Sequence, residues 1–146
     1  MARDWLWQLR NSCGAVVVGG LLCTAPAWAA NPQAVEAGKR LYLKYCATCH
    51  GREAKGDGPL AATLKTKTPD LTQLAKQHNG KFPYLEVLDI LDGGTPYPAH
   101  GSAEMPAWGQ TFQSDEPGAS GSTMDQAVVR GRLMLLTDYL RAIQAP

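Results

Sequence analysis

The sequence predicts an all-α protein with three helices joined by glycine- and proline-rich loops. Apolar side chains recur every three or four residues in about 34–49, 84–91 and 125–143, the spacing of one face of an α-helix. The stretches around these ranges hold most of the 15 glycines and 10 prolines, which interrupt regular structure. No segment shows the clear apolar–polar alternation typical of a half-buried strand. The expected fold class is therefore all-α.

The ends of the helices also carry sequence signals. Gly51 follows the first range and Gly93 follows the second, and glycine frequently ends a helix. In the third range, Asp125 is expected to be the N-cap, and Arg141 suits the negative end of the helix dipole. These signals predict helices over about Ala34–Cys49, Tyr84–Leu91 and Asp125–Ile143.

The most informative motif closes the first predicted helix, where Cys46 and Cys49 are followed directly by His50. C-x-x-C-H is the attachment motif of a c-type haem. The two thiols lie within one helical turn, so both can bond to one porphyrin. The histidine after them is held under the ring, where its imidazole can bind the iron. The motif occurs once and predicts one covalent haem c, attached at Cys46 and Cys49 with His50 as the proximal ligand.

Two other uses of a C-x-x-C pair are weaker alternatives. A structural zinc site needs two more thiolate or imidazole ligands. The only other cysteines, Cys13 and Cys23, lie in an N-terminal segment that we expect to be removed. A thioredoxin-like redox pair would follow a strand, whereas residues 34–45 are typical of a helix.

Residues 1–29 are typical of a signal peptide. Arg3 and Arg10 precede an uncharged stretch, and residues 27–29 (Ala-Trp-Ala) have the small-x-small form of a cleavage site. The apolar core is shorter than the roughly 20 residues of a membrane span, although an uncleaved anchor remains the alternative. Haem is joined to C-x-x-C-H outside the bacterial cytoplasm, so export agrees with the motif. We expect a periplasmic domain over 30–146 with no membrane span.

Charge is distributed unevenly along this expected domain. Residues 31–68 carry seven basic and three acidic side chains, residues 69–125 carry two and eight, and residues 126–146 carry three and one. Such an asymmetry can steer the approach of a protein partner, while an ordinary solvated surface is an equal alternative. Nothing in this pattern indicates binding of nucleic acid.

A second axial ligand for the iron can be sought among the remaining histidines and methionines. The candidates beyond residue 50 are His78, His100, Met105, Met124 and Met134. Met105 is favoured because Pro106 stiffens its loop, and a weakly binding thioether must be presented at little entropic cost. Met134 is typical of helix packing, and Met124 borders a Gly/Ser loop. His100 is the main rival and an open coordination site is the third alternative. A thioether ligand implies a higher reduction potential than two histidines give.

With His50 and Met105 as ligands, residues 34–143 resemble a class I (mitochondrial-type) bacterial cytochrome c. The resemblance implies a small cytochrome c fold, in which the N- and C-terminal helices cross and short middle helices and loops surround one haem. Gly38 and Tyr42 resemble the residues that allow a close crossing. Their counterparts on the last helix are Leu136 and Tyr139.

The resemblance also implies roles around the ligands. Gly58 and Pro59 resemble the loop whose proline carbonyl accepts a hydrogen bond from the proximal histidine. Trp108, in the methionine loop, is expected to shield the haem or its propionates. Residues 114–123 lengthen the connection to the final helix and are expected to form a flexible loop.

The expected function is one-electron transfer in a periplasmic respiratory chain, without enzymatic activity. The donor would be a reductase or dehydrogenase and the acceptor a terminal oxidase or reductase. Basic side chains are expected to ring the electron port, namely Lys39, Lys44, Arg52 and Lys55. A haem c subunit of a periplasmic dehydrogenase or oxidase complex is the alternative. A third reading is an enzyme or sensor in which Met105 does not bind iron.

Overall fold

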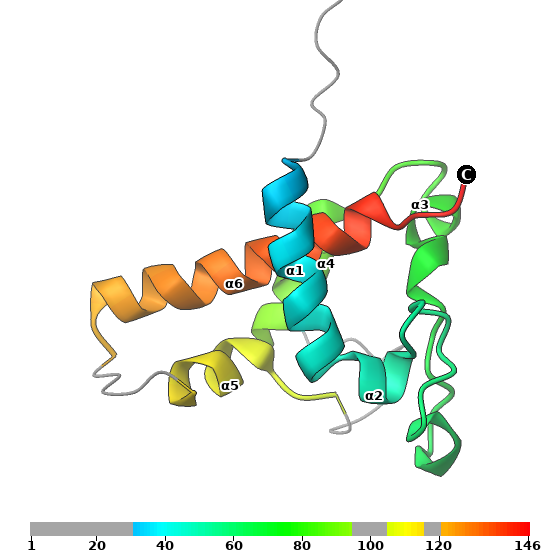
Figure 1. Cartoon of the computed structure of the whole chain (residues 1–146), viewed down its shortest axis with the longest axis horizontal. Helices are drawn as coiled ribbons and strands as arrows, with labels where there is room; N and C mark the ends of the chain where they lie inside the picture. Colours follow the sequence, from blue (N-terminus) through cyan, green and yellow to red (C-terminus); the bar gives the residue numbers. More distant parts are fainter. Residues whose placement is uncertain (1–30, 95–104, 116–120) are drawn as a thin grey trace, which may run out of the picture.

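The computed structural model describes residues 31–94, 105–115 and 121–146, and this part of the chain is all-helical, as predicted. No strand occurs among these residues. Neither the predicted signal peptide nor His100 lies within them. The elements are α1 (Pro32–Tyr45), α2 (Ala47–His50), η1 (Ala61–Thr63), η2 (Leu71–Gln73), α3 (Leu74–Gln77), α4 (Tyr84–Asp92), α5 (Trp108–Ser114) and α6 (Thr123–Ala142) (Figure 1). None of the helices in these ranges combines the length and apolarity that crossing a membrane requires.

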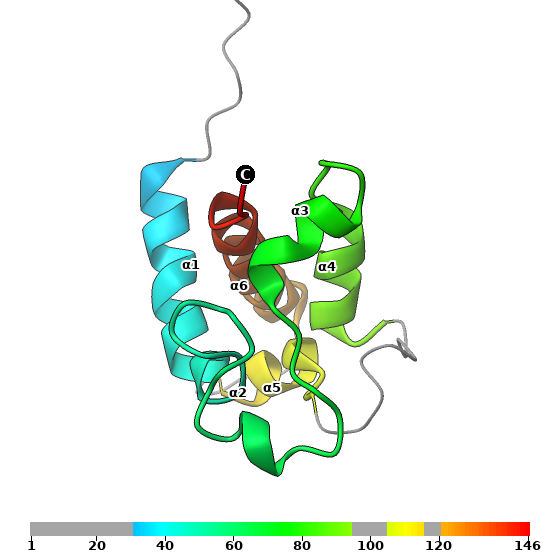
Figure 2. The same ribbon diagram turned by 90° about the vertical axis from the view of Figure 1, so that its right-hand side faces the viewer.

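The first and last helices cross closely, as expected for a cytochrome c fold (Figure 1). Gly38 is buried in α1, and a β-carbon there would lie 2.8 Å from the β-carbon of Tyr139. The Tyr42 and Tyr139 rings pack 5.2 Å apart between their centroids. Figure 2 shows α1 and α4 on either side of α6, with α2 and α5 at one end of them.

The helix ends differ from the predictions in two places. The first predicted helix is divided at Cys46, whose N–H still donates to the Tyr42 carbonyl at 2.8 Å. The N-cap of α6 is Ser122 rather than Asp125. The Ser122 hydroxyl accepts from the Asp125 N–H, and the Asp125 carboxylate accepts from the Ser122 N–H. This reciprocal capping box satisfies two free backbone donors, so α6 begins before the predicted start.

The sequence did not predict α5. Its Phe112 is fully buried, and the ring centroids of Tyr45 and Phe112 lie 5.1 Å apart. Trp108, at the start of α5, packs 5.6 Å from Tyr45. Of the predicted flexible loop over 114–123, Ser114 ends α5 and Thr123 begins α6, while residues 116–120 lie outside the described residues.

Candidate haem site

A largely apolar pocket, partly open to solvent, lies between the first two helices, residues 64–74, α4, α6 and the segment that leads into α5. Aliphatic side chains from four separate segments form most of its wall. They include Leu64, Leu71, Val87, Leu91, Leu136 and Leu140. A flat apolar macrocycle would bury its faces against these side chains, which the hydrophobic effect favours.

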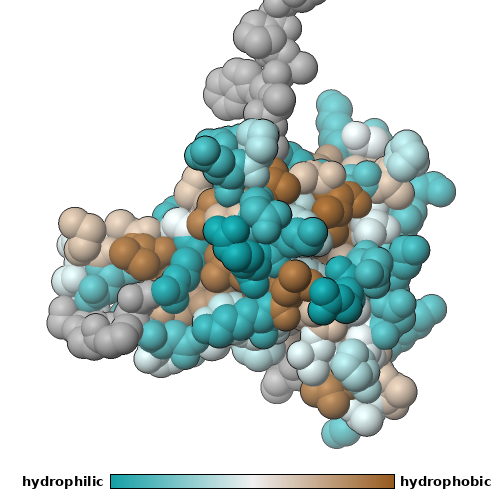
Figure 3. Space-filling model, viewed as in Figure 1, coloured by the Kyte–Doolittle hydropathy of each residue, from teal (hydrophilic) through white to brown (hydrophobic). Residues whose placement is uncertain are grey.

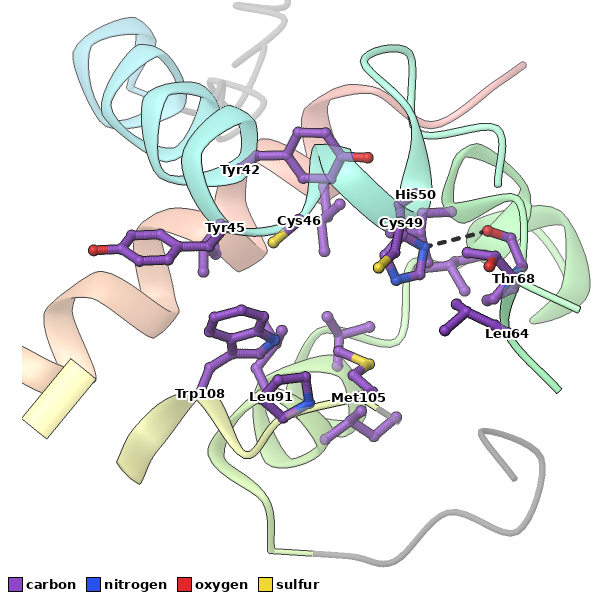
Figure 4. A pocket seen from close by; sticks show the side chains of 18 of the residues that line it. Tyr42, Tyr45, Cys46, Cys49, His50, Leu64, Thr68, Leu91, Met105 and Trp108 are labelled. Carbon is purple, nitrogen blue, oxygen red and sulfur yellow. Dashed lines mark hydrogen bonds between the residues drawn. The ribbon is translucent and has the colours of Figure 1, made fainter. Parts of the chain in front are cut away.

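Both cysteines and the histidine of the C-x-x-C-H motif line this pocket (Figure 4). Cys46 lies at the junction of α1 and α2, and its carbonyl accepts from the His50 N–H at 2.9 Å. The two thiols are free. Burial, reinforced by the nearby Cys49 thiol, raises the pKa of Cys46 to about 12, so this thiol is protonated at neutral pH.

Gly58 and Pro59 have a different role from the one that the resemblance implied. The Gly58 N–H donates to the Cys49 carbonyl at 3.2 Å. A β-carbon on Gly58 would lie 2.5 Å from the Thr48 carbonyl oxygen, so only glycine fits there without rearrangement. Gly58 thus braces the backbone of α2. Pro59 is exposed, and neither residue lines the pocket.

The carbonyl that faces the imidazole belongs to Pro69, which corrects the expectation for Pro59. His50 Nδ1 lies 3.4 Å from the Pro69 carbonyl oxygen (Figure 4). With a proton on Nδ1, the ring donates to this carbonyl and keeps Nε2 available for a metal. Pro59 and Pro69 are the first two prolines after the motif, and the second of them, ten residues further along the chain, reaches the histidine. Ala54 helps to bring it there, because its carbonyl accepts from the Leu71 N–H at 2.8 Å.

Gln144, which sequence reasoning missed, fastens the segment after Pro69 to the end of α6. Its side-chain amide donates to the carbonyls of Leu71 at 2.8 Å and Leu140 at 2.7 Å. The Gln144 side-chain oxygen accepts from the Ala75 N–H at 2.8 Å. Three hydrogen bonds from one side chain hold the proximal wall of the pocket against α6. No sequence motif signals this role, because it depends on two segments about 70 residues apart.

Met105 is half-buried and lies across the pocket from His50 (Figure 4). Pro106 also lines the pocket, and the buried Trp108 ring closes the same wall. The segment packs against the end of α4, because a β-carbon on Gly93 would lie 2.5 Å from the Ala107 β-carbon. Met105 is thus presented at the start of a segment whose following residues, Ala107 and Trp108, are packed against the rest of the protein.

The other described candidates for a second ligand lie away from the pocket. The exposed fractions are 73% for Met124 and 44% for Met134. His78 Nδ1 pairs with the Leu74 carbonyl at 2.8 Å, and its Nε2 lies 3.5 Å from the Glu86 carboxylate. Among the described candidates, Met105 alone faces the motif histidine.

The donor set fits haem c better than the rival cofactors. Two thiols, an imidazole and a thioether meet in an apolar cavity. Within 31–94, 105–115 and 121–146, no three His, Cys, Asp or Glu side chains gather to hold a metal ion, so the zinc reading gains no support there. The residues before Cys46 form a helix, whereas a thioredoxin-like pair follows a strand. The pocket also contains a buried hydroxyl with no partner, that of Thr68.

The comparisons with known proteins agree with this chemistry. A family model described as "Cytochrome C oxidase, cbb3-type, subunit III" matches residues 33–119, a range that spans both the C-x-x-C-H motif and Met105. No solved structure matches the chain. The family match covers more than half of the sequence and shows a c-type cytochrome, a redox protein with covalently bound haem c and its iron. The chain belongs to the family of cbb3-type cytochrome c oxidase subunit III domains.

Proposed function

We propose that this protein is a one-electron carrier of the bacterial periplasm, with its haem attached to Cys46 and Cys49 and its iron held by His50 and Met105. The observation that carries the proposal is the meeting of these four side chains in one apolar pocket, with Met105 opposite His50 (Figure 4). The bound haem supplies a ferric/ferrous couple that exchanges one electron.

The protein's own residues would set the properties of this couple. The Pro69 carbonyl, 3.4 Å from Nδ1, orients the His50 ring and increases its basicity. The Met105 thioether is a soft ligand that favours the ferrous state and raises the reduction potential. Because both axial bonds would be kept in the two redox states, little would need to move between them. The aliphatic wall limits the access of water.

Exposed basic residues close to the motif support docking to an acidic redox partner. Lys39, Lys44, Arg52 and Lys55 are all exposed, on the helix and the loop that flank the two cysteines. Opposite charges steer encounter, and salt screens them. Stopped-flow electron transfer to an acidic acceptor should slow as ionic strength rises. Lys55→Glu should slow it further, whereas Arg130→Glu on α6 should have little effect. Insensitivity to salt would contradict this docking face.

The periplasmic location is supported by the signal-like residues 1–29. Edman sequencing of the protein isolated from the periplasmic fraction should give a mature chain that begins at Ala30. A membrane-bound chain that still begins at Met1 would instead show an uncleaved anchor.

A haem c subunit of a larger redox complex is the second candidate. Large apolar side chains are exposed along α6, including Met124, Val128 and Met134, and apolar surface is visible over its projecting half (Figure 3). The description of the matched family, an oxidase subunit, points the same way. Light scattering on gently extracted native protein separates the two candidates. A free carrier should give the mass of one chain, and a subunit should elute with a larger assembly.

A further inference from the structure

Thr68 presents a buried polar group that the protein itself leaves without a partner. The residue is 7% exposed, and its Oγ1 has no hydrogen-bond partner. Its backbone carbonyl is packed against Gly56. A buried hydroxyl that stays unpaired destabilises the folded protein, because it has lost its hydrogen bonds to water. Thr68 lines the haem pocket, so whatever fills that pocket is in a position to supply the missing partner.

The surroundings of Thr68 form the polar edge of the pocket. Thr66, Lys67 and Thr68 all line it, and they are consecutive in the chain. Apart from these three residues and the motif, the polar groups of the described lining are two tyrosine hydroxyls and the Trp108 indole N–H, which belongs to the wall formed with Met105; the other lining side chains are aliphatic, proline and methionine. The two tyrosine hydroxyls are already engaged, since Tyr42 donates to the Gly51 carbonyl and Tyr45 to the Asp115 carboxylate.

A haem has a matching asymmetry. Its ring nitrogens are occupied by iron, and its faces and remaining edges are apolar. Its only free hydrogen-bond acceptors are the two propionate carboxylates, which leave from one edge of the ring. A carboxylate is a strong acceptor for a hydroxyl, and a lysine ammonium balances its charge.

We propose that the propionate edge of the haem faces residues 66–68, with the Thr68 hydroxyl donating a hydrogen bond to one propionate and Lys67 supplying a positive charge beside it. This inference assigns a cofactor contact and the orientation of the ring in the pocket. It relies on the haem occupying this pocket and is independent of which partner exchanges electrons with the protein.

The test compares the haem-loaded full-length protein with three variants. Thr68→Val keeps the shape of the side chain and removes the donor, and Thr68→Ser keeps the donor. Thr63→Val is the control, because it removes an exposed hydroxyl that donates to the Leu60 carbonyl outside the pocket. Resonance Raman spectroscopy reports hydrogen bonding through the propionate-bending band. The band should shift in Thr68→Val and stay in place in Thr68→Ser and Thr63→Val.

An unchanged band in Thr68→Val would overturn the proposal, as would an equal shift in Thr63→Val. The Soret absorption of each variant shows separately whether the haem is bound, so a loss of haem is not mistaken for a lost hydrogen bond. Should Thr68→Val fail to mature, a crystal structure of the haem-loaded wild-type protein gives the same answer. Thr68 Oγ1 should lie roughly 2.5–3.0 Å from a propionate oxygen. A water molecule between them, or a propionate edge that faces elsewhere, would refute the assignment.

Discussion

Gly38 of α1 and Leu135 of α6 meet backbone to backbone at the point where the two helices cross. A β-carbon added to Gly38 would overlap the Leu135 carbonyl oxygen. Because α1 leads directly into Cys46, this contact positions the haem motif as well as the helix pair. The crossing thus links the stability of the fold to the geometry of the pocket.

Replacing Gly38 with alanine should therefore destabilise the protein. We expect the free energy of unfolding to fall by about 1–3 kcal/mol, the usual effect of overpacking, although alanine favours helix. Gly131→Ala on α6 is the matched control, because a β-carbon there meets no atom within 4 Å. Gly131→Ala should raise the free energy of unfolding by about 0.5–1 kcal/mol. Urea unfolding measures the stability of both variants. Equal changes in Gly38→Ala and Gly131→Ala would contradict the close crossing of α1 and α6.

Tyr42→Phe should show what one buried hydroxyl contributes. Tyr42 is fully buried, and its hydroxyl donates to the Gly51 carbonyl at 2.7 Å. Its loss should cost about 1–2 kcal/mol at pH 7, since it leaves a buried acceptor unpaired. Urea unfolding of wild type and Tyr42→Phe, monitored by circular dichroism, measures the difference.

The same pair of proteins should differ in pH dependence. Burial, with a smaller contribution from Cys46, raises the pKa of Tyr42 above its ordinary value of 10.0. The contribution of this neutral phenol to stability is complete below pH 10 and is lost as pH rises through the raised value. The stability gap between wild type and Tyr42→Phe should narrow above pH 10, and a constant gap would refute this pKa shift.

Two proline variants distinguish the carbonyls that could face the proximal histidine. Pro69→Ala should disturb the carbonyl that faces His50 Nδ1 and raise the reduction potential, because a less basic imidazole stabilises ferric iron less well. A hydrogen bond of about 1 kcal/mol corresponds to roughly 40 mV for one electron. Pro59→Ala, at an exposed position, should leave the potential unchanged. Spectroelectrochemical titration measures the reduction potential of each variant. A changed potential in Pro59→Ala with an unchanged one in Pro69→Ala would show that the Pro59 carbonyl faces the histidine.

Substitution of Met105 tests the sixth ligand. In Met105→Ala, the sulfur-to-iron charge-transfer band of the ferric protein should disappear, and the potential should fall by about 59 mV or more, a tenfold change in the equilibrium. Met124→Ala is the control, because Met124 is 73% exposed. If the band persists in Met105→Ala, another group binds the iron.

Local signals in the sequence were sufficient for the fold class and for the haem motif. Apolar periodicity predicted α1, α4 and α6, and the pentapeptide predicted haem c, which the family match supports. The helix α5 was missed because its seven residues are too few to show a clear period. A resemblance in sequence selected Pro59, whereas the distance to His50 depends on how the loop after the motif folds back. Thr68 became visible only through its burial.

The most direct test of the account is the mass of the purified, denatured protein beside that of Cys46→Ala/Cys49→Ala. The wild-type chain should retain the added mass of one haem and its colour after extraction with acidified organic solvent. The double variant should have the mass of the polypeptide alone. Covalent attachment through these two cysteines would be contradicted if the wild-type chain lost its haem in that solvent or carried no haem at all.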